Sequence, residues 1–375
     1  MSIFLLVVGL ILFVGLVVVH EFGHLLAARR GGVEVEEFGI GFPPRAWSKK
    51  LKSGMLFTLN WLPLGGFVKL KGEHDSATAK GSFGAASLTT KIQVMLAGVV
   101  MNLLTAFALL TVLALVGMPK IIENQFTVKS DTKVVNSQVL AGYIEPGSPA
   151  DKAKLELRDR LVSISDGSKT VQIDSIPALQ NGTEQFSGKK IELNITRDGK
   201  EQSISTVLRS REEVNASKKT DQPKGYLGVV LNELTVQRST WSSPIVAVGL
   251  IKQLTVETFK GLGNALWNVI RGQGKAASQQ VSGPVGIFVL LKDGSGLGYQ
   301  YMLMIIAIIS LTLAIMNVLP IPALDGGRLF VTLLYRKVLR KPLSQDKEEQ
   351  IHGTGFALLM LLFVVITVVD VRRFF

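Results

Sequence analysis

The chain contains the stretch His20-Glu21-Phe22-Gly23-His24, whose spacing places two imidazoles on the same face of a helix. Two imidazoles four residues apart can share one metal ion, with Glu21 beside the open coordination position. Zinc is the natural occupant, because two imidazoles and one carboxylate leave a fourth position for water, whose proton a neighbouring glutamate can accept. These residue types therefore predict metal-assisted peptide hydrolysis.

This metal motif lies at the end of a hydrophobic run. No charged residue occurs between Ile3 and Val19, and the apolar character resumes after the motif as far as Ala28. Ligating groups at membrane depth are costly, so they indicate a functional site. A cleaved signal peptide would discard or expose the motif, and we therefore expect a retained span. The alternative is a pair of histidines that only make hydrogen bonds within a helix bundle.

Composition agrees with a membrane protein that carries some soluble mass. The chain has 375 residues, of which 47% are hydrophobic, and its mean hydropathy is +0.35. It has no cysteine, so a metal must be held by histidine and carboxylate. The net charge is +12, but in the soluble segments the basic residues are not interleaved with aromatic residues. We assign this charge to membrane flanks and expect no nucleic-acid partner.

Hydrophobic stretches predict four transmembrane helices, at 1–28, 92–118, 299–327 and 353–371. In the second, Gly98 precedes Asn102 by four residues, a pattern that suits either close helix packing or an active-site amide. The third runs into Pro320 and Pro322, which interrupt the helix before Asp325. Asp325 is thus an intramembrane carboxylate that needs a partner.

The segments outside the spans predict three further elements. Residues 29–91 include β-forming residues 56–70 around Pro63-Leu64-Gly65-Gly66, which predict a hairpin that either dips towards the bilayer or lies on the surface. Residues 128–235 resemble one PDZ domain, an α/β fold, in the Gly147-Ser148-Pro149-Ala150 step before a short helix. Residues 241–298 predict an amphipathic helical segment on the membrane or against that domain.

Charge distribution orients these spans. Lysine and arginine are frequent between the first two spans and again at 336–341, so both connections are expected in the cytoplasm. Spans one and three then run inward, which brings His20, His24 and Asp325 to a similar depth near the cytoplasmic side. Asp325 is therefore a possible third ligand, although a turn residue before Gly326 is the alternative. The PDZ domain is expected on the extracytoplasmic side of a cell inner membrane.

Taken together, these motifs resemble the site-2 protease family of intramembrane zinc metalloproteases, of the bacterial RseP type with a single PDZ domain. The similarity includes the motif from Asn317 to Gly326 and covers nearly the whole chain. It implies that His20, His24 and Asp325 bind Zn2+ and that Glu21 is the general base. It further implies that Asn102 and Asn317 lie near the substrate backbone or metal, and that the hairpin guides an unwound substrate helix.

The expected function is cleavage of transmembrane segments in single-pass proteins already shortened by another protease, such as anti-sigma factors or remnant signal peptides, in regulated intramembrane proteolysis. The expected fold is a polytopic α-helical membrane protein with an inserted PDZ domain and a membrane-associated β-hairpin. Such a protein could instead be an inactive scaffold, although the intact Glu21 argues against that. A transporter would need ionisable residues across span four, and 353–369 has none. The specific substrate and the oligomeric state stay open. His74 and His352 are expected to face solvent.

Overall fold

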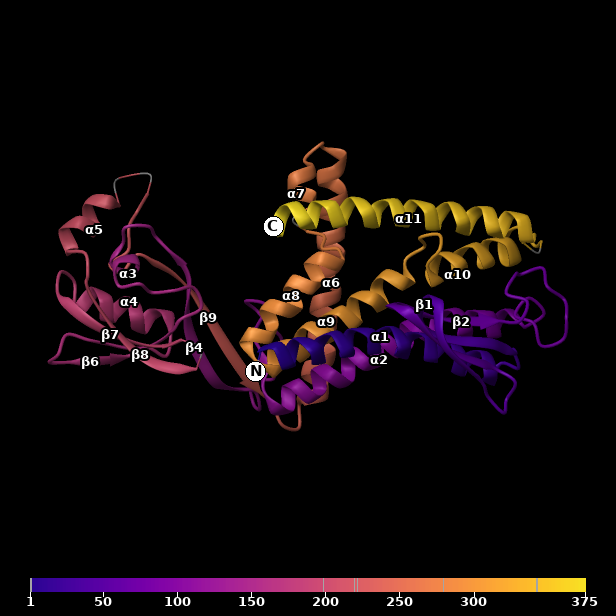
Figure 1. The fold of residues 1–375 in the computed structure, drawn as a ribbon, viewed down its shortest axis with the longest axis horizontal. Coiled ribbons are helices and arrows are strands. Elements are labelled where there is room, and N and C mark those ends of the chain that lie inside the picture. The colour runs from indigo at the N-terminus through magenta and orange to yellow at the C-terminus, as the bar shows by residue number, and fades with distance from the viewer. Residues whose placement is uncertain (1, 198, 219, 221, 279, 342) are drawn as a thin grey trace. The chain divides into compact units, whose positions relative to one another are not determined.

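The computed structural model describes residues 2–197, 199–218, 220, 222–278, 280–341 and 343–375. The chain forms two compact units. The membrane unit comprises Met1–Val116, Gln125–Val128 and Thr240–Phe375, and the α/β unit comprises Gly117–Asn124 and Lys129–Ser239. Figure 1 shows both units in ribbon form.

The membrane unit is mainly helical. Its helices are α1 (Ser2–Arg30), α2 (Leu88–Val116), α6 (Ser243–Ile270), α7 (Gly274–Ser278), α8 (Pro284–Leu297), α9 (Tyr299–Val318), α10 (Asp325–Leu333), the π-helix η1 (Leu334–Val338) and α11 (Gln345–Phe374). Among the described residues, four helices are long and apolar enough to cross a membrane: α1, α2, α9 and α11. This confirms the number of spans expected from the sequence; Met1 lies outside the described residues.

Two span boundaries differ from those expected. α9 ends at Val318, because the prolines that follow cannot continue its hydrogen bonding, and Asp325 begins the separate helix α10. α11 begins at Gln345 rather than at 353. Its first two turns are charged but helix-forming, so hydropathy marked only the apolar part of the helix.

α2 packs closely against α1. A Cβ atom at Gly23 of α1 would lie 2.6 Å from the carbonyl oxygen of Ala97 on α2, so only glycine allows this approach. On another side of α1, Leu16 packs in a buried cluster with Leu291 of α8 and Met302 of α9. The helix that bears the metal motif is therefore fixed by packing on two sides.

A β-sheet lies beside the C-terminal part of α1 (Figure 1), and Leu25 of α1 packs on it with Phe38 and Met55. The sheet is built from β1 (Val35–Lys50) and β2 (Leu56–Leu70). Residues 35–40 pair with 66–70 and also with 56–59, whereas residues 45–50 pair with 56–60. The two bent strands therefore form a sheet four segments wide.

The chain reverses within residues 56–70, where the sequence predicted a turn, but the two arms do not pair with each other. Both arms belong to β2 and pair with β1. Residues 56–59 run parallel to residues 37–40, whereas residues 66–69 run antiparallel to the same residues. The chain therefore turns back across the Pro-Leu-Gly-Gly step, where Gly65 has a φ of 126°, and residues 37–40 of β1 lie between the two arms.

The C-terminal end of α11 is held by a polar contact to α8. Oδ2 of the fully buried Asp370 accepts hydrogen bonds of 2.8 Å from the backbone N–H groups of both Gly283 and Gly286, at the first turn of α8. A carboxylate is favourable there because the first N–H groups of a helix lack intrahelical partners. Residues 241–298, expected to be an amphipathic helical segment, contain α6, α7 and α8.

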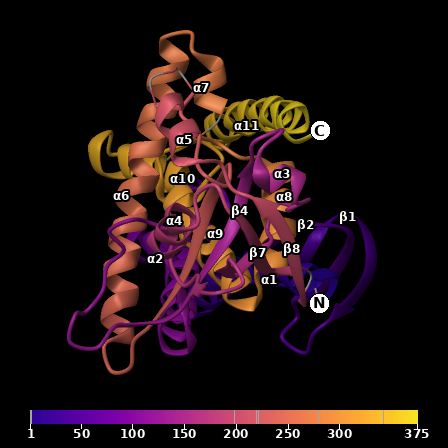
Figure 2. The ribbon, with the colours of Figure 1, turned by 90° about the vertical axis from the view of Figure 1, so that its left-hand side faces the viewer.

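The α/β unit combines a sheet with short helices (Figure 2). Its elements are β3 (Met118–Pro119), β4 (Lys133–Ile144), α3 (Pro149–Lys152), β5 (Arg160–Ser165), β6 (Thr170–Gln172), α4 (Ile176–Gln185), β7 (Lys190–Arg197), β8 (Lys200–Val207), α5 (Arg211–Ser217) and β9 (Val229–Arg238). The strand order is β3-β9-β4-β5-β7-β8, with β6 beside β5. α3 begins after Ser148, whose side chain accepts a hydrogen bond from Asp151 N–H, where the sequence predicted a short helix. The assignment as a PDZ domain stays a prediction.

Candidate active site

The structure brings His20, His24 and Asp325 together. Nε2 of His20 lies 3.0 Å from Oδ2 of Asp325, and Nε2 of His24 lies 3.3 Å from the same oxygen. The two Nε2 atoms are 3.2 Å apart. Among the described residues these three side chains form the group able to hold a metal ion, with their ligand atoms within 4.8 Å of one another. The third-ligand interpretation of Asp325 is thereby favoured over a simple turn residue.

Each imidazole is oriented by a contact from α2. Nδ1 of His24 donates a hydrogen bond of 2.7 Å to the carbonyl oxygen of Val94, which leaves its Nε2 with a lone pair for a metal. Nδ1 of His20 lies 3.2 Å from the side-chain nitrogen of the buried Asn102. Among the residues that the structure describes, none makes a hydrogen bond to the buried amide oxygen of Asn102.

This orphaned oxygen fits a metal-loaded state. When Nε2 of His20 binds a metal, the neutral ring carries its proton on Nδ1 and needs an acceptor there. Rotation of the Asn102 amide by half a turn places its oxygen at that proton and satisfies both groups. The donor set of two imidazoles and one carboxylate therefore suits zinc and leaves a coordination position open.

Gly98 provides the space that the imidazoles occupy. A Cβ atom at this position would lie 2.5 Å from Cε1 of His20 and 2.5 Å from Nε2 of His24. Real Cβ atoms do not approach so closely, so any larger residue would displace one of the rings. The Gly98 and Asn102 pair thus serves the site itself in addition to helix packing.

Glu21 lines a cavity of about 130 Å³ together with His24 and Asp325. The cavity is closed on one side by Val68 of β2 and on another by Met95 of α2. Segment 66–70 of the sheet runs beside Glu21, since a Cβ atom at Gly66 would lie 3.2 Å from Cγ of Glu21. A carboxylate is therefore placed in the same cavity as the metal-binding cluster.

The loop before α10 positions Asp325 at the metal-binding cluster. Leu324 is the N-cap of α10 and Asp325 its first residue. A Cβ atom at Gly326 would lie 2.3 Å from the Val318 carbonyl oxygen, and one at Gly327 would lie 2.0 Å from the Ile321 carbonyl oxygen. The paired glycines after Asp325 are thus required for the loop to fold back on the end of α9.

Asn317 lies half-buried in the last turn of α9. In the part of the chain that the structure describes, no hydrogen bond joins it to the cluster, so its place at the substrate or metal stays a prediction. Sequence reasoning missed the Val94 carbonyl and Arg328, which also lines the Glu21 cavity. Arg328 follows Asp325 by three residues, a helical spacing that could have pointed to it.

Comparison with known proteins identifies the class. Residues 8–362 match the model of peptidase family M50. The chain therefore belongs to peptidase family M50, the site-2 protease family, as the motifs indicated.

Several relatives match over almost their whole length. A Clostridium perfringens protein named as a candidate zinc metalloprotease is 31% identical over 374 residues, which cover 98% of each chain. The zinc metalloprotease RasP of Geobacillus kaustophilus is 28% identical and aligns over 98% of this chain and 97% of its own. RasP of Shouchella clausii is 26% identical over 96% of this chain and 97% of its own.

Proposed function

We propose that the protein is a zinc-dependent endopeptidase that cleaves transmembrane segments of single-pass membrane proteins within the bilayer. The observation that carries the proposal is the convergence of His20 and His24 with Asp325, which lies 305 residues further along the chain, around a cavity that also contains Glu21. The named relatives are zinc metalloproteases, which supports zinc as the metal.

The residues divide the chemistry between them. His20, His24 and Asp325 would hold zinc, which supplies Lewis acidity to a water molecule and to the scissile carbonyl. Glu21 accepts the proton of the attacking water and returns it to the leaving nitrogen, as a general base and then a general acid. Val94 and Asn102 keep the two imidazoles in the tautomers that binding requires.

Substrate binding is expected along β2. Peptide bonds inside a helix are shielded, so a transmembrane substrate must unwind before it is cut. Segment 66–70 pairs on one side with residues 35–40 and runs beside Glu21, and an extended substrate could add to the sheet there. Such pairing would hold the scissile bond of the substrate next to the Glu21 carboxylate.

Pre-shortened substrates, such as anti-sigma factors or remnant signal peptides in regulated intramembrane proteolysis, suit this arrangement. The α/β unit, proposed as a PDZ domain on the extracytoplasmic side, would exclude bulky outer domains or bind free termini. The site itself would lie near the cytoplasmic side of an inner membrane, because the connections around it are rich in lysine and arginine.

The deciding experiment is cleavage, in membranes, of a tagged single-span substrate that lacks an outer domain. Wild-type protein is compared with Glu21→Gln and with the matched control Glu36→Gln, whose carboxylate is exposed on the sheet and pairs with Lys69. Zinc content is measured in all three. We expect bound zinc in each, product from the wild type and the control, and a rate at least about 100-fold lower for Glu21→Gln.

Two results would contradict the proposal. Cleavage by Glu21→Gln at the wild-type rate would remove Glu21 from its role as base. A complete lack of product from zinc-loaded wild type, with several such substrates, would favour a membrane scaffold that binds partners through its α/β unit.

A further inference from the structure

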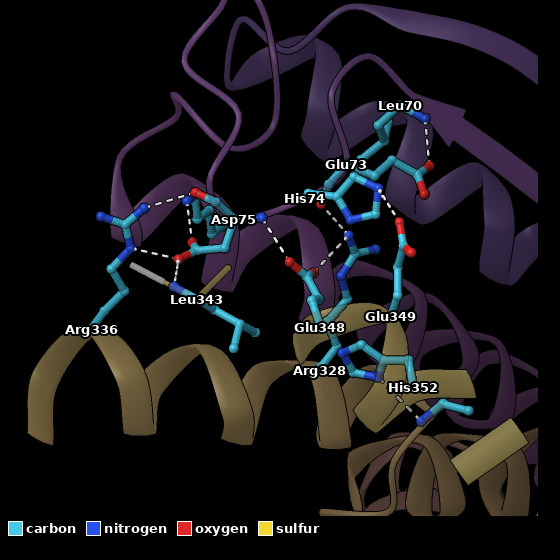
Figure 3. Close-up of polar contacts among 12 residues, drawn as sticks. Leu70, Glu73, His74, Asp75, Arg328, Arg336, Leu343, Glu348, Glu349 and His352 are labelled. Atoms are coloured by element: carbon cyan, nitrogen blue, oxygen red, sulfur yellow. Dashed lines mark hydrogen bonds and ion pairs between the residues drawn. The ribbon is translucent and has the colours of Figure 1, made fainter. Parts of the chain in front are cut away.

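A buried ionic cluster has Asp75 at its centre (Figure 3), and it includes Arg328, which lines the Glu21 cavity. Oδ1 of Asp75 accepts a hydrogen bond from Lys91, and its Oδ2 accepts one of 2.8 Å from Arg336 and one of 3.1 Å from Leu343 N–H. The backbone N–H of Asp75 donates to Oε2 of Glu348 at 2.8 Å. Asp75, Lys91 and Glu348 are 2%, 1% and 4% exposed, so this cluster is part of the core.

Arg328 connects this cluster to the end of β2. Its Nη2 donates to the carbonyl oxygen of Glu73 and lies 3.6 Å from Oε1 of Glu348. Its guanidinium also lies over the ring of Phe83, 4.9 Å from the centroid. The Glu73 carboxylate in turn accepts a hydrogen bond of 2.7 Å from Leu70 N–H, the last residue of β2. Figure 3 shows Arg328 between Glu348 and the Glu73 and His74 segment.

Two cations of the cluster, Arg328 and Lys91, each lie one helical turn from a group of the active site. Arg328 follows Asp325 by three residues on α10, and Lys91 precedes Val94 by three residues on α2. Residues this far apart lie on the same side of a helix, so fixing one restricts the rotation and translation of the other. The loop between β2 and α2 is therefore tied to both helices that flank the metal-binding cluster.

Each charged side chain of the cluster has a partner of opposite charge. Asp75 pairs with Lys91 of α2 and Arg336 of η1, and Glu348 of α11 pairs with Arg328 of α10. Buried ionic groups add little stability over apolar packing, but they are directional and fix a geometry once every partner is present. Asp325, the proposed third metal ligand, lies on a helix of only nine residues that follows an irregular loop. Its position therefore depends on contacts that hold this helix in place.

We propose that Arg328 is a positioning residue for Asp325, and that it holds α10 at the distance from α2 at which the Asp325 carboxylate meets His20 and His24. This role rests on the proposed function, because it presupposes a metal at these three residues. Arg328 is not among the three residues that would hold the metal. It acts through the backbone of α10, with Glu348 and the Glu73 carbonyl as its anchors.

The test uses the purified full-length protein stripped of metal and refilled with Co2+ or Zn2+. Arg328→Gln removes the cation at nearly constant length, and Arg328→Lys keeps the charge but lacks the forked guanidinium. Lys71→Gln is the control, since Lys71 lies in the same loop and forms an exposed ion pair of 2.9 Å with Glu34. The readouts are the visible absorption bands of Co2+, which report coordination geometry, the affinity for Zn2+ by chelator competition, and thermal unfolding.

For Arg328→Gln we expect shifted Co2+ bands and a Zn2+ affinity about 10-fold weaker, as is typical when outer contacts of a metal site are lost. Arg328→Lys should lie between this variant and wild type, and Lys71→Gln should match wild type. A folded Arg328→Gln with wild-type Co2+ bands and Zn2+ affinity would overturn the positioning role alone. If that variant does not fold, Arg328→Lys decides, and unchanged bands in it would overturn the role. Wild-type protein that binds neither metal would overturn the proposed function, and the positioning role with it.

Discussion

Gly98 of α2 faces His24 of α1 so closely that a Cβ atom at Gly98 would lie 2.5 Å from Nε2, the nitrogen that faces Asp325. We therefore expect Gly98→Ala to displace the ring, because the added methyl group and the imidazole cannot share that volume. Zinc content should fall well below one per chain, and cleavage should drop at least about 100-fold. Metal analysis by mass spectrometry and the membrane cleavage assay check this.

Gly263→Ala is the matched control, since Gly263 lies within α6 and a Cβ atom there meets nothing within 4 Å. It should retain zinc and activity, because alanine favours a helix over glycine. Full zinc occupancy in Gly98→Ala would contradict the packing argument.

Asn102 offers a test of the hydrogen bond to His20. Asn102→Asp keeps an acceptor oxygen for the Nδ1 proton, so zinc affinity should be preserved or increased. Asn102→Leu has a similar volume but no acceptor, and its zinc affinity should be about 10-fold weaker. Chelator competition on the purified protein measures both. Equal affinities for the two variants would show that Asn102 serves helix packing alone.

Asp75 predicts a pH dependence of stability. Burial raises its pKa, but hydrogen bonds from Lys91, Arg336 and Leu343 N–H outweigh burial and hold that pKa below its usual value. A carboxyl with a depressed pKa in the folded state stabilises the fold above its unfolded pKa of about 3.9, and loses this contribution as pH falls through the folded pKa. Wild-type protein should therefore keep this stabilisation at neutral pH.

Asp75→Asn leaves Lys91 buried without its carboxylate, and should lower the free energy of unfolding by about 3 kcal/mol at pH 7. Melting temperatures of the two proteins should differ by a constant amount from about pH 8 to pH 5 and converge below about pH 4. A difference that persists unchanged at pH 3 would contradict the assignment to the Asp75 charge.

The absence of cysteine makes the membrane orientation testable without background labelling. Lys80 in the loop before α2 and Ser168 in the α/β unit are both exposed. In intact cells, a membrane-impermeant maleimide should label Ser168→Cys and should reach Lys80→Cys only after permeabilisation. The reverse pattern would place the active site near the opposite side of the membrane.

The chemistry of the site was predictable from sequence because it depends on short-range spacing. His20 and His24 share a helix face, and span direction alone brought Asp325 to their depth. Gly98 and Asn102 were recognisable as a pair, although their contact with the imidazoles depends on how α1 and α2 pack.

The remainder depends on long-range packing that a single sequence does not contain. The Pro63-Leu64-Gly65-Gly66 step was recognisable as a turn, but the position of β1 between its two arms depends on pairing with a distant segment. His352 was expected to face solvent, yet it lies half-buried in α11, where Ala323 N–H donates to its Nδ1 at 3.4 Å. The contacts of Arg328 with Glu348 could not be predicted, because α10 and α11 are brought together by the intervening loop.

The separation of His20 from Asp325 by 305 positions has a consequence for biogenesis. At about 5–20 residues per second, the carboxylate is synthesised roughly 15–60 s after the imidazoles. During that interval the nascent chain has two imidazoles in the membrane and lacks the carboxylate that completes the cluster. Under the proposed function, the order of synthesis thus keeps the site incomplete while neighbouring chains are inserted at the translocation machinery.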